Sequence, residues 1–159
     1  MSRLYSFKAV QKFPADLETV WEFISSPANL RLITPPFVGF EVLTETTEQM
    51  FAGQIIAYKI SPLFGLKLNW VTEITEVKEM EYFVDEQRSG PYSIWRHKHF
   101  LKPLSFGVEM QDEVSYKIPF SFIGDAANYL LVSRRIRQIF DYRYKALEER
   151  FGKYGSVTA

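Results

Sequence analysis

The chain has 159 residues and a mass of 18.6 kDa, the size of one ordinary domain of about 100–200 residues. It contains no cysteine, which excludes disulfides, thiolate metal sites and cysteine nucleophiles. Basic and acidic residues number 19 each, and this balance argues against a nucleic-acid-binding domain, which usually carries a basic excess. Aromatic residues make up 16% of the chain, a content that suits both a packed core and an apolar ligand cavity.

The N-terminal segment, residues 1–8, lacks a basic stretch followed by an apolar run of about 7–15 residues, so we expect no signal peptide. No apolar run approaches the roughly 18 residues that a membrane-spanning helix needs. We therefore expect a soluble, cytoplasmic protein with no membrane span. No linker or repeat divides the sequence, which predicts a single domain over residues 1–152 and a loose C-terminal tail over residues 153–159.

The first part of the chain is expected to form a strand and two short helices. Residues 5–13 alternate in the way that favours a strand, which Pro14 ends. Asp16 is a good helix N-cap, and apolar residues at helical spacing follow it. A second short helix over residues 28–33 should stop at Thr34, because a residue before proline avoids the helical region.

The rest of the chain predicts six more strands and a long helix. The strands are expected over residues 40–45, 54–60, 66–77, 81–88, 93–101 and 108–118. From about Asp125 to Phe151, apolar residues recur every three or four positions, among them Tyr129 and Tyr144, and Gly152 is a suitable C-cap. A helix of about 27 residues spans roughly 40 Å and can cross a whole sheet. This order predicts an α+β fold, in which an antiparallel sheet carries its helices on one face.

Short motifs spread over roughly residues 3–151 carry a family resemblance. They are Phe13-Pro14-Ala15-Asp16-Leu17, Val20-Trp21, Pro27-Ala28-Asn29-Leu30, Ile33-Thr34-Pro35-Pro36, Trp70-Val71-Thr72-Glu73-Ile74, Phe83-Val84-Asp85-Glu86-Gln87, Gly90-Pro91-Tyr92, Trp95-Arg96-His97-Lys98-His99 and Asp112-Glu113-Val114-Ser115-Tyr116. With these motifs the sequence resembles the START-like or SRPBCC superfamily, the helix-grip fold, which includes polyketide cyclases and dehydrases, lipid-transfer domains and plant pollen allergens. It is most similar to a bacterial branch of small ligand-binding proteins, some labelled cell-division inhibitors or cyclase-like.

The resemblance implies a curved antiparallel sheet of about seven strands wrapped around a long C-terminal helix, with two short helices after the first strand. The branch often has Pro-Phe-Gly before the last helix, where this chain has Pro119-Phe120-Ser121. Because the superfamily holds carriers, receptors and enzymes, the resemblance indicates the fold far more strongly than the function.

The two histidines of the sequence, His97 and His99, are the sharpest candidates for chemistry. Residues two apart in a strand share a face, so these histidines point the same way as Trp95. The opposite face carries Arg96 and Lys98, and we therefore assign the histidine face to the interior.

Asp112 is the one charged residue on the apolar face of the next predicted strand. A buried carboxylate needs a partner, and a turn between the two strands would bring His97 or His99 opposite it. We predict that Asp112 is buried and hydrogen-bonded to His97, His99 or Tyr116.

Asp85 and Gln87, from the preceding strand, are expected to join these side chains in a polar cluster inside an aromatic cavity. The wider set predicted to bind a ligand is Trp70, Phe83, Asp85, Gln87, Trp95, His97, His99, Met110, Asp112, Tyr116, Ile136 and Phe140.

Four interpretations of the cluster compete. The first is a satisfied polar network that fixes strand register, and the second is a set that orients a ligand in an apolar pocket. The third is a His–Asp dyad for general acid–base catalysis, with His97, His99 and Asp112 as catalytic candidates. The fourth is a metal site with two ligands from His-x-His and a third from Asp112. Nothing else in the sequence supports a metal, so we expect neither a metal nor a cofactor.

Three turns are unusually apolar, at residues 35–37, 62–64 and 119–123. Such turns form contact surfaces or rim the mouth of a cavity. The run Arg134-Arg135-x-Arg137 is expected to be a solvated helix face.

The sequence favours a carrier or sensor that binds a small hydrophobic molecule, such as a lipid, an aromatic or a polyketide-like compound, between the sheet and the C-terminal helix. The first alternative is a cyclase- or dehydrase-type enzyme that uses a His–Asp pair as general acid and base. The further alternative is a protein-interaction module related to cell division. The ligand, the oligomeric state and the existence of a reaction stay open, and no nucleic-acid partner is expected.

Overall fold

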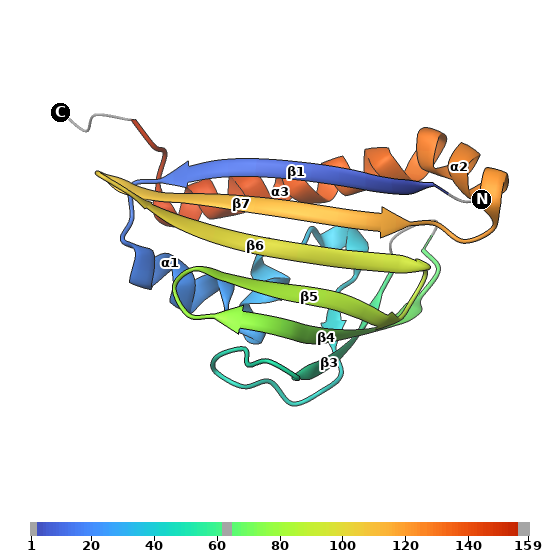
Figure 1. The fold of residues 1–159 in the computed structure, drawn as a ribbon, viewed down its shortest axis with the longest axis horizontal. Coiled ribbons are helices and arrows are strands. Elements are labelled where there is room, and N and C mark those ends of the chain that lie inside the picture. The colour runs from blue at the N-terminus through green and yellow to red at the C-terminus, as the bar shows by residue number, and fades with distance from the viewer. Residues whose placement is uncertain (1–2, 62–64, 156–159) are drawn as a thin grey trace.

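A curved antiparallel sheet dominates this computed structural model, which describes residues 3–61 and 65–155 (Figure 1). Within those residues, seven strands pair in the order β1-β7-β6-β5-β4-β3-β2. They are β1 (Leu4–Phe13), β2 (Glu41–Val42), β3 (Ile55–Ile60), β4 (Leu68–Lys78), β5 (Tyr82–Ser89), β6 (Ile94–Leu104) and β7 (Gly107–Lys117). The expected α+β, START-like architecture is confirmed.

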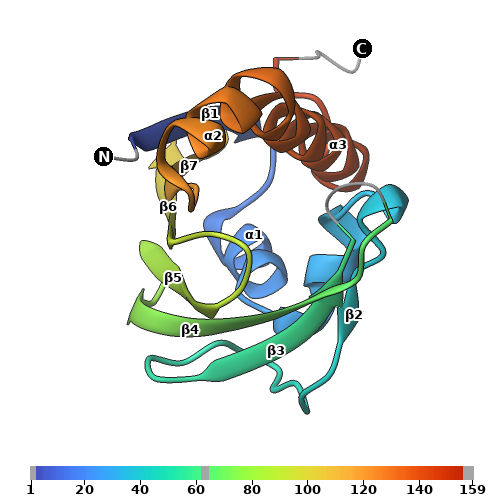
Figure 2. The same ribbon diagram turned by 90° about the vertical axis from the view of Figure 1, so that its right-hand side faces the viewer.

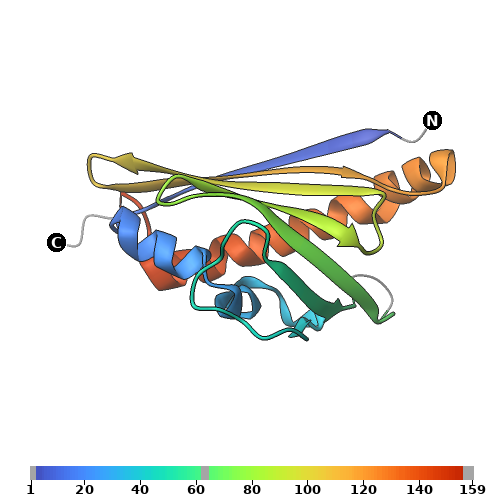
Figure 3. The ribbon, with the colours of Figure 1, turned by 60° about the horizontal axis from the view of Figure 1, so that its bottom comes forward.

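The helices lie on one side of the sheet (Figure 3). Helix α1 (Leu17–Ile24) is followed by the 3₁₀ segments η1 (Pro27–Ile33) and η2 (Pro36–Val38). At the other end of the chain, α2 (Ser121–Ala127), the π-helical segment η3 (Asn128–Val132) and α3 (Ser133–Phe151) run on without a break. Figure 2 shows α3 closing the open side of the curved sheet, and α3 contacts both β1 and η1. Among the described residues, no helix is long and apolar enough to cross a membrane.

Most local predictions agree with the structure. The carboxylate of Asp16 accepts a hydrogen bond from the Thr19 backbone N–H at 2.8 Å, as expected of an N-cap. The strand predicted over residues 40–45 is wrong in length, because only Glu41 and Val42 pair with β3. The second short helix is a 3₁₀ segment rather than an α-helix.

The C-terminal helix differs from the prediction in its start and in its face. It begins at Ser121 rather than near Asp125, and the π-helical η3 adds a residue to one turn. The extra residue rotates the inward stripe, so Val132 is buried while Tyr129 is 84% exposed. Tyr144, also placed on the apolar face by the sequence, is 45% exposed.

The turn before α2 has an unusual backbone. Phe120 and Ser121 have φ angles of 72° and 51°, in the left-handed region that favours glycine. Ser121 thus takes a glycine-like conformation at the position where the similar bacterial branch often has glycine. Residues 62–64 and 156–159 lie outside the described residues, so the apolar turn at 62–64 and the end of the predicted tail are not placed.

The interior is solid at one end and hollow towards the other. The larger core cluster packs α1 and the last turns of α3 onto the sheet around Phe13, Trp21 and Leu147. Ile74 and Phe83 belong to this cluster and also line the cavity described below, so the solid core forms one wall of the hollow part.

Candidate ligand-binding site

A cavity of about 490 Å³ lies between the concave face of the sheet and the C-terminal helix. This volume falls within the range of about 300–1,000 Å³ that is common for small-molecule sites. Its walls are largely apolar and include Ile56, Tyr58, Ile60, Trp70, Ile74 and Phe83 from the sheet and Val132, Ile136, Ile139 and Phe140 from the helix.

An aromatic group forms part of the cavity wall. The ring centroids of Trp70, Tyr92 and Trp95 lie 4.8–5.5 Å from one another, in tilted and edge-to-face arrangements. The indole Nε1 of Trp70 is buried and has no hydrogen-bond partner among the described residues. This wall therefore combines apolar surface with one buried donor that has no hydrogen-bond partner among the described residues.

The structure places eight of the predicted ligand-binding residues on the cavity lining, namely Trp70, Phe83, Asp85, Trp95, His97, His99, Ile136 and Phe140. Four others do not line it. Gln87 folds back onto the Tyr92 backbone, and Met110 packs in the solid core. Tyr116 donates its hydroxyl hydrogen bond to Asn128 at 2.8 Å, and Asp112 lies behind the histidines.

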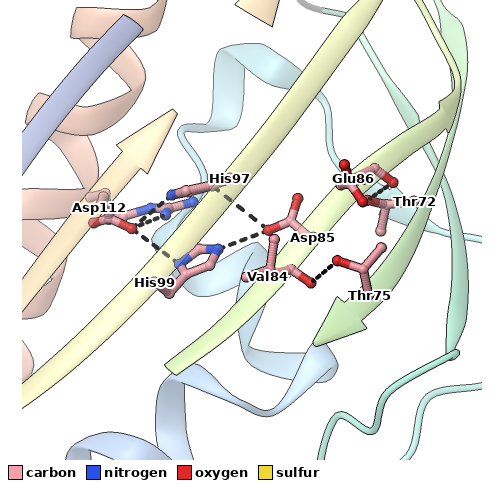
Figure 4. A network of polar contacts seen from close by, with 9 residues as sticks. Thr72, Thr75, Val84, Asp85, Glu86, His97, His99 and Asp112 are labelled. Carbon is pink, nitrogen blue, oxygen red and sulfur yellow. Dashed lines mark hydrogen bonds and ion pairs between the residues drawn. The ribbon is translucent and has the colours of Figure 1, made fainter. Parts of the chain in front are cut away.

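A compact polar cluster sits on this lining, where β5, β6 and β7 run side by side (Figure 4). The strand register pairs Asp85 with His97 and His99 with Asp112, all on the inward face. His97 Nε2 lies 2.8 Å and His99 Nδ1 3.1 Å from Asp112 Oδ1. His99 Nε2 lies 2.8 Å from Asp85 Oδ2. The two imidazoles, with centroids 3.6 Å apart, are thus held between two carboxylates.

Asp112 is 2% exposed and hydrogen-bonded to His97, as its place on the apolar face of β7 predicts. Its expected alternative partner Tyr116 is too far along the strand and belongs to the pair with Asn128. Gln87 and Tyr116 therefore stand outside the polar cluster that the sequence assigned to them.

Arg143 was not among the residues predicted from the sequence, and α3 brings it to the same cluster. Its Nη1 lies 3.7 Å from Asp112 Oδ1, and its side chain is 13% exposed. The signal was present, because Arg143 follows Ile136 and Phe140 at helical spacing on the inward stripe. A cation on a buried stripe indicates a partner inside the fold.

The hydrogen-bond partners of each titratable side chain in the cluster shift its pKa. Burial raises the pKa of Asp112, but the hydrogen bonds from His97 and His99 outweigh it and bring the pKa well below the usual range. Asp85 has a lowered pKa in the same way, since the His99 hydrogen bond and the charges around it outweigh burial. Burial and the nearby His99 lower the pKa of His97 to about 4. Despite burial, hydrogen bonds to Asp112 and Asp85 raise the pKa of His99. The lowered pKa values keep both carboxylates in their charged form, beside the two histidines and the Arg143 guanidinium.

We expect the two histidines to titrate apart. NMR titration of the ring signals should show His97 neutral through the ordinary histidine range near 6.5 and protonating at about 4. His99 should keep its proton above 6.5, since its pKa is raised. Both rings titrating together at an unperturbed value would contradict the cluster geometry.

The pKa shifts of His97 and His99 make the free energy of unfolding depend on pH in opposite directions. The unfolded state binds a proton at His97 near pH 6.5, whereas the folded state binds it only near 4, so acidification through this window lowers the free energy of unfolding. The stabilising contribution of His99 is complete below about 6.5 and is lost as pH rises through its raised folded-state pKa.

Three groups of the cluster could also hold a metal ion. Asp85, His97 and His99 each offer one ligand atom, and these atoms lie within 4.8 Å of one another. The third ligand of this set is Asp85, not Asp112 as the sequence suggested. Such an ion would take the place of the hydrogen bond between His99 Nε2 and Asp85 Oδ2. The structure thus brings three candidate ligand atoms together, and both carboxylates of the cluster already have histidine nitrogens as partners.

The expected apolar turns lie partly at the cavity. Phe120 lines the cavity and is 79% exposed, and its neighbours Phe122 and Ile123 are exposed on α2. Phe37, from the first turn, lies under the Arg135 guanidinium at 4.5 Å from its ring centroid. Arg135 also lines the cavity, so the arginine run is not entirely a solvated face.

A family model described as polyketide cyclase / dehydrase and lipid transport matches residues 13–141. The chain belongs to this family, and its fold is START-like. A search of the curated proteins finds no match.

Solved structures share the fold. A START superfamily protein from Mycobacterium smegmatis has a TM-score of 0.67 at 14% identity, covering 92% of this chain and 96% of that chain. The protein TTHA0849 from Thermus thermophilus has a TM-score of 0.68 at 19% identity, with coverages of 92% and 97%. Ginseng major latex-like protein 151 from Panax ginseng has a TM-score of 0.64 at 8% identity, with coverages of 93% and 97%. At these identities the likeness establishes the fold alone.

Proposed function

We propose that the protein binds a small hydrophobic molecule in the cavity between the sheet and α3, and acts as a carrier or sensor. The observation that supports this most is a cavity of about 490 Å³ with largely apolar walls and a compact polar cluster on one of them. Apolar walls supply affinity through the area removed from water, and a few convergent polar groups fix orientation. A lipid, an aromatic or a polyketide-like compound has the matching chemistry.

The second candidate is a cyclase- or dehydrase-type enzyme. Its support is that both imidazoles of the polar cluster line the cavity and can reach a bound carbonyl compound. A general base works best when its pKa lies near the operating pH. His97, with a pKa of about 4, is a weak base, and both ring nitrogens of His99 are engaged by carboxylates. These properties favour binding over proton transfer.

The test is a titration with Nile red, an uncharged apolar dye. We expect saturable binding of one dye per chain with a blue-shifted emission. At roughly 0.3 kcal/mol per non-hydrogen atom, a dye of this size binds with a Kd on the order of 10 µM or tighter. The variant Phe122→Ser, which removes an exposed ring outside the cavity lining, is the control and should bind equally. A linear, non-saturating signal, or a signal lost in Phe122→Ser, would count against a cavity ligand.

A further inference from the structure

Arg143 is an under-satisfied cation in the cavity wall. Its Nε is buried and has no hydrogen-bond partner in the part of the chain that the structure describes. The nearest carboxylate atom given for it, Asp112 Oδ1, lies 3.7 Å from Nη1, which is too long for a hydrogen bond. That oxygen is already engaged by two imidazole nitrogens at 2.8 and 3.1 Å. A buried N–H donor without an acceptor costs free energy, so an acceptor supplied by a ligand would stabilise this guanidinium.

The charges that line the cavity point the same way. Of the described lining residues, Asp85 carries the one carboxylate, and its Oδ2 is hydrogen-bonded to His99. Besides the two histidines of the polar cluster, the lining carries two arginines, Arg135, which lies over the Phe37 ring, and Arg143. On the described lining the arginines therefore outnumber the carboxylate, and Trp70 Nε1 is a second buried donor without a hydrogen-bond partner.

We propose that the natural ligand is an apolar molecule that ends in a carboxylate, with the carboxylate bound by Arg143 and the apolar body against the aromatic wall. Guanidinium and carboxylate match in shape, and their charge-assisted hydrogen bonds are stronger than those between neutral groups. This inference rests on the proposed function, because it names the class of ligand for the same cavity.

The experiment compares decanoate with 1-decanol as competitors of bound Nile red at pH 7.5. The two probes share an alkyl chain and differ in the charged end. We expect decanoate to bind about 10- to 100-fold more tightly, which is the range for a hydrogen bond to a charged partner. In Arg143→Gln the ratio of the two affinities should fall below about 3-fold, with Arg143→Lys intermediate because it keeps the charge and loses Nε.

Arg134→Gln is the matched control, since Arg134 is an exposed arginine on the same helix that does not line the cavity. It should keep the full preference for decanoate. Equal binding of decanoate and 1-decanol by the unaltered chain would overturn the carboxylate proposal and leave the hydrophobic cavity standing. If neither probe displaces the dye and the dye itself does not bind, both proposals fail. The comparison of decanoate with 1-decanol on the unaltered chain needs no variant. It therefore tests the carboxylate proposal even if Arg143→Gln folds poorly.

Discussion

Replacement of Asp112 by alanine is expected to lower the free energy of unfolding by about 3–5 kcal/mol, the usual effect of breaking a buried charged pair from one side. The carboxylate is 2% exposed and accepts from both histidines, so its loss leaves two imidazoles and the Arg143 guanidinium without the carboxylate that lies between them. At roughly 2–4 °C per kcal/mol for a chain of this size, the melting temperature should fall by about 6–20 °C.

Glu113→Ala is the control for this prediction. Glu113 is the next residue on the same strand but points outward, where it pairs with Lys8 at 2.8 Å on a largely exposed surface. Exposed pairs contribute about 0–1 kcal/mol, so the control should melt close to the unaltered chain. Equal melting temperatures for Asp112→Ala and Glu113→Ala would mean that Asp112 is not the centre of the buried cluster.

Replacement of Ile139 by tryptophan is expected to weaken Nile red binding at least about 10-fold, which corresponds to roughly 1.4 kcal/mol. Ile139 lines the cavity and packs near the Trp70 and Trp95 rings, so the larger indole occupies space that a ligand would need. Because the added ring enters a cavity rather than a packed core, the loss of stability should stay within about 1–3 kcal/mol.

Gln138→Trp adds the same ring one residue earlier, on an exposed position that does not line the cavity. It should leave the dye affinity unchanged. A folded Ile139→Trp variant that binds Nile red as tightly as Gln138→Trp would show that the dye sits elsewhere.

The site could be predicted from the alternation of apolar and polar residues in the strands, because the burial of one face fixes the strand register. A shift of one residue would turn Asp112, His97 and His99 outward together with the apolar residues beside them. The sequence therefore predicted both the inward face and the neighbourhood of these three groups. It placed Asp85 correctly for the same reason, since β5 pairs Asp85 directly with His97.

Features that depend on where one element ends or how a helix is rotated could not be predicted in this way. The last residue pair between β5 and β6 is Glu86 with Arg96, and Gln87 lies beyond it. The Gln87 side chain is hydrogen-bonded to the backbone of Tyr92 in the following turn. Tyr116 is hydrogen-bonded to Asn128, which is buried at the start of the π-helical η3. Arg143 reaches Asp112 only because α3 crosses the sheet at this point, a matter of tertiary packing rather than of local pattern.

The charge state of the cluster also could not be predicted from the sequence. Whether His97 or His99 holds the proton depends on distances of 2.8–3.8 Å to two carboxylates, which the residue types alone do not give. The same distances set how closely a carboxylate holds each ring nitrogen.

The central claim, that the cavity holds a small hydrophobic molecule, is tested most directly by native mass spectrometry of the chain isolated from its own cells without denaturation. We expect a mass excess of one small molecule per chain, which disappears on denaturation and is absent from Ile139→Trp isolated in parallel. A bare chain mass in the native spectrum, from protein that also fails to take up Nile red, would contradict it.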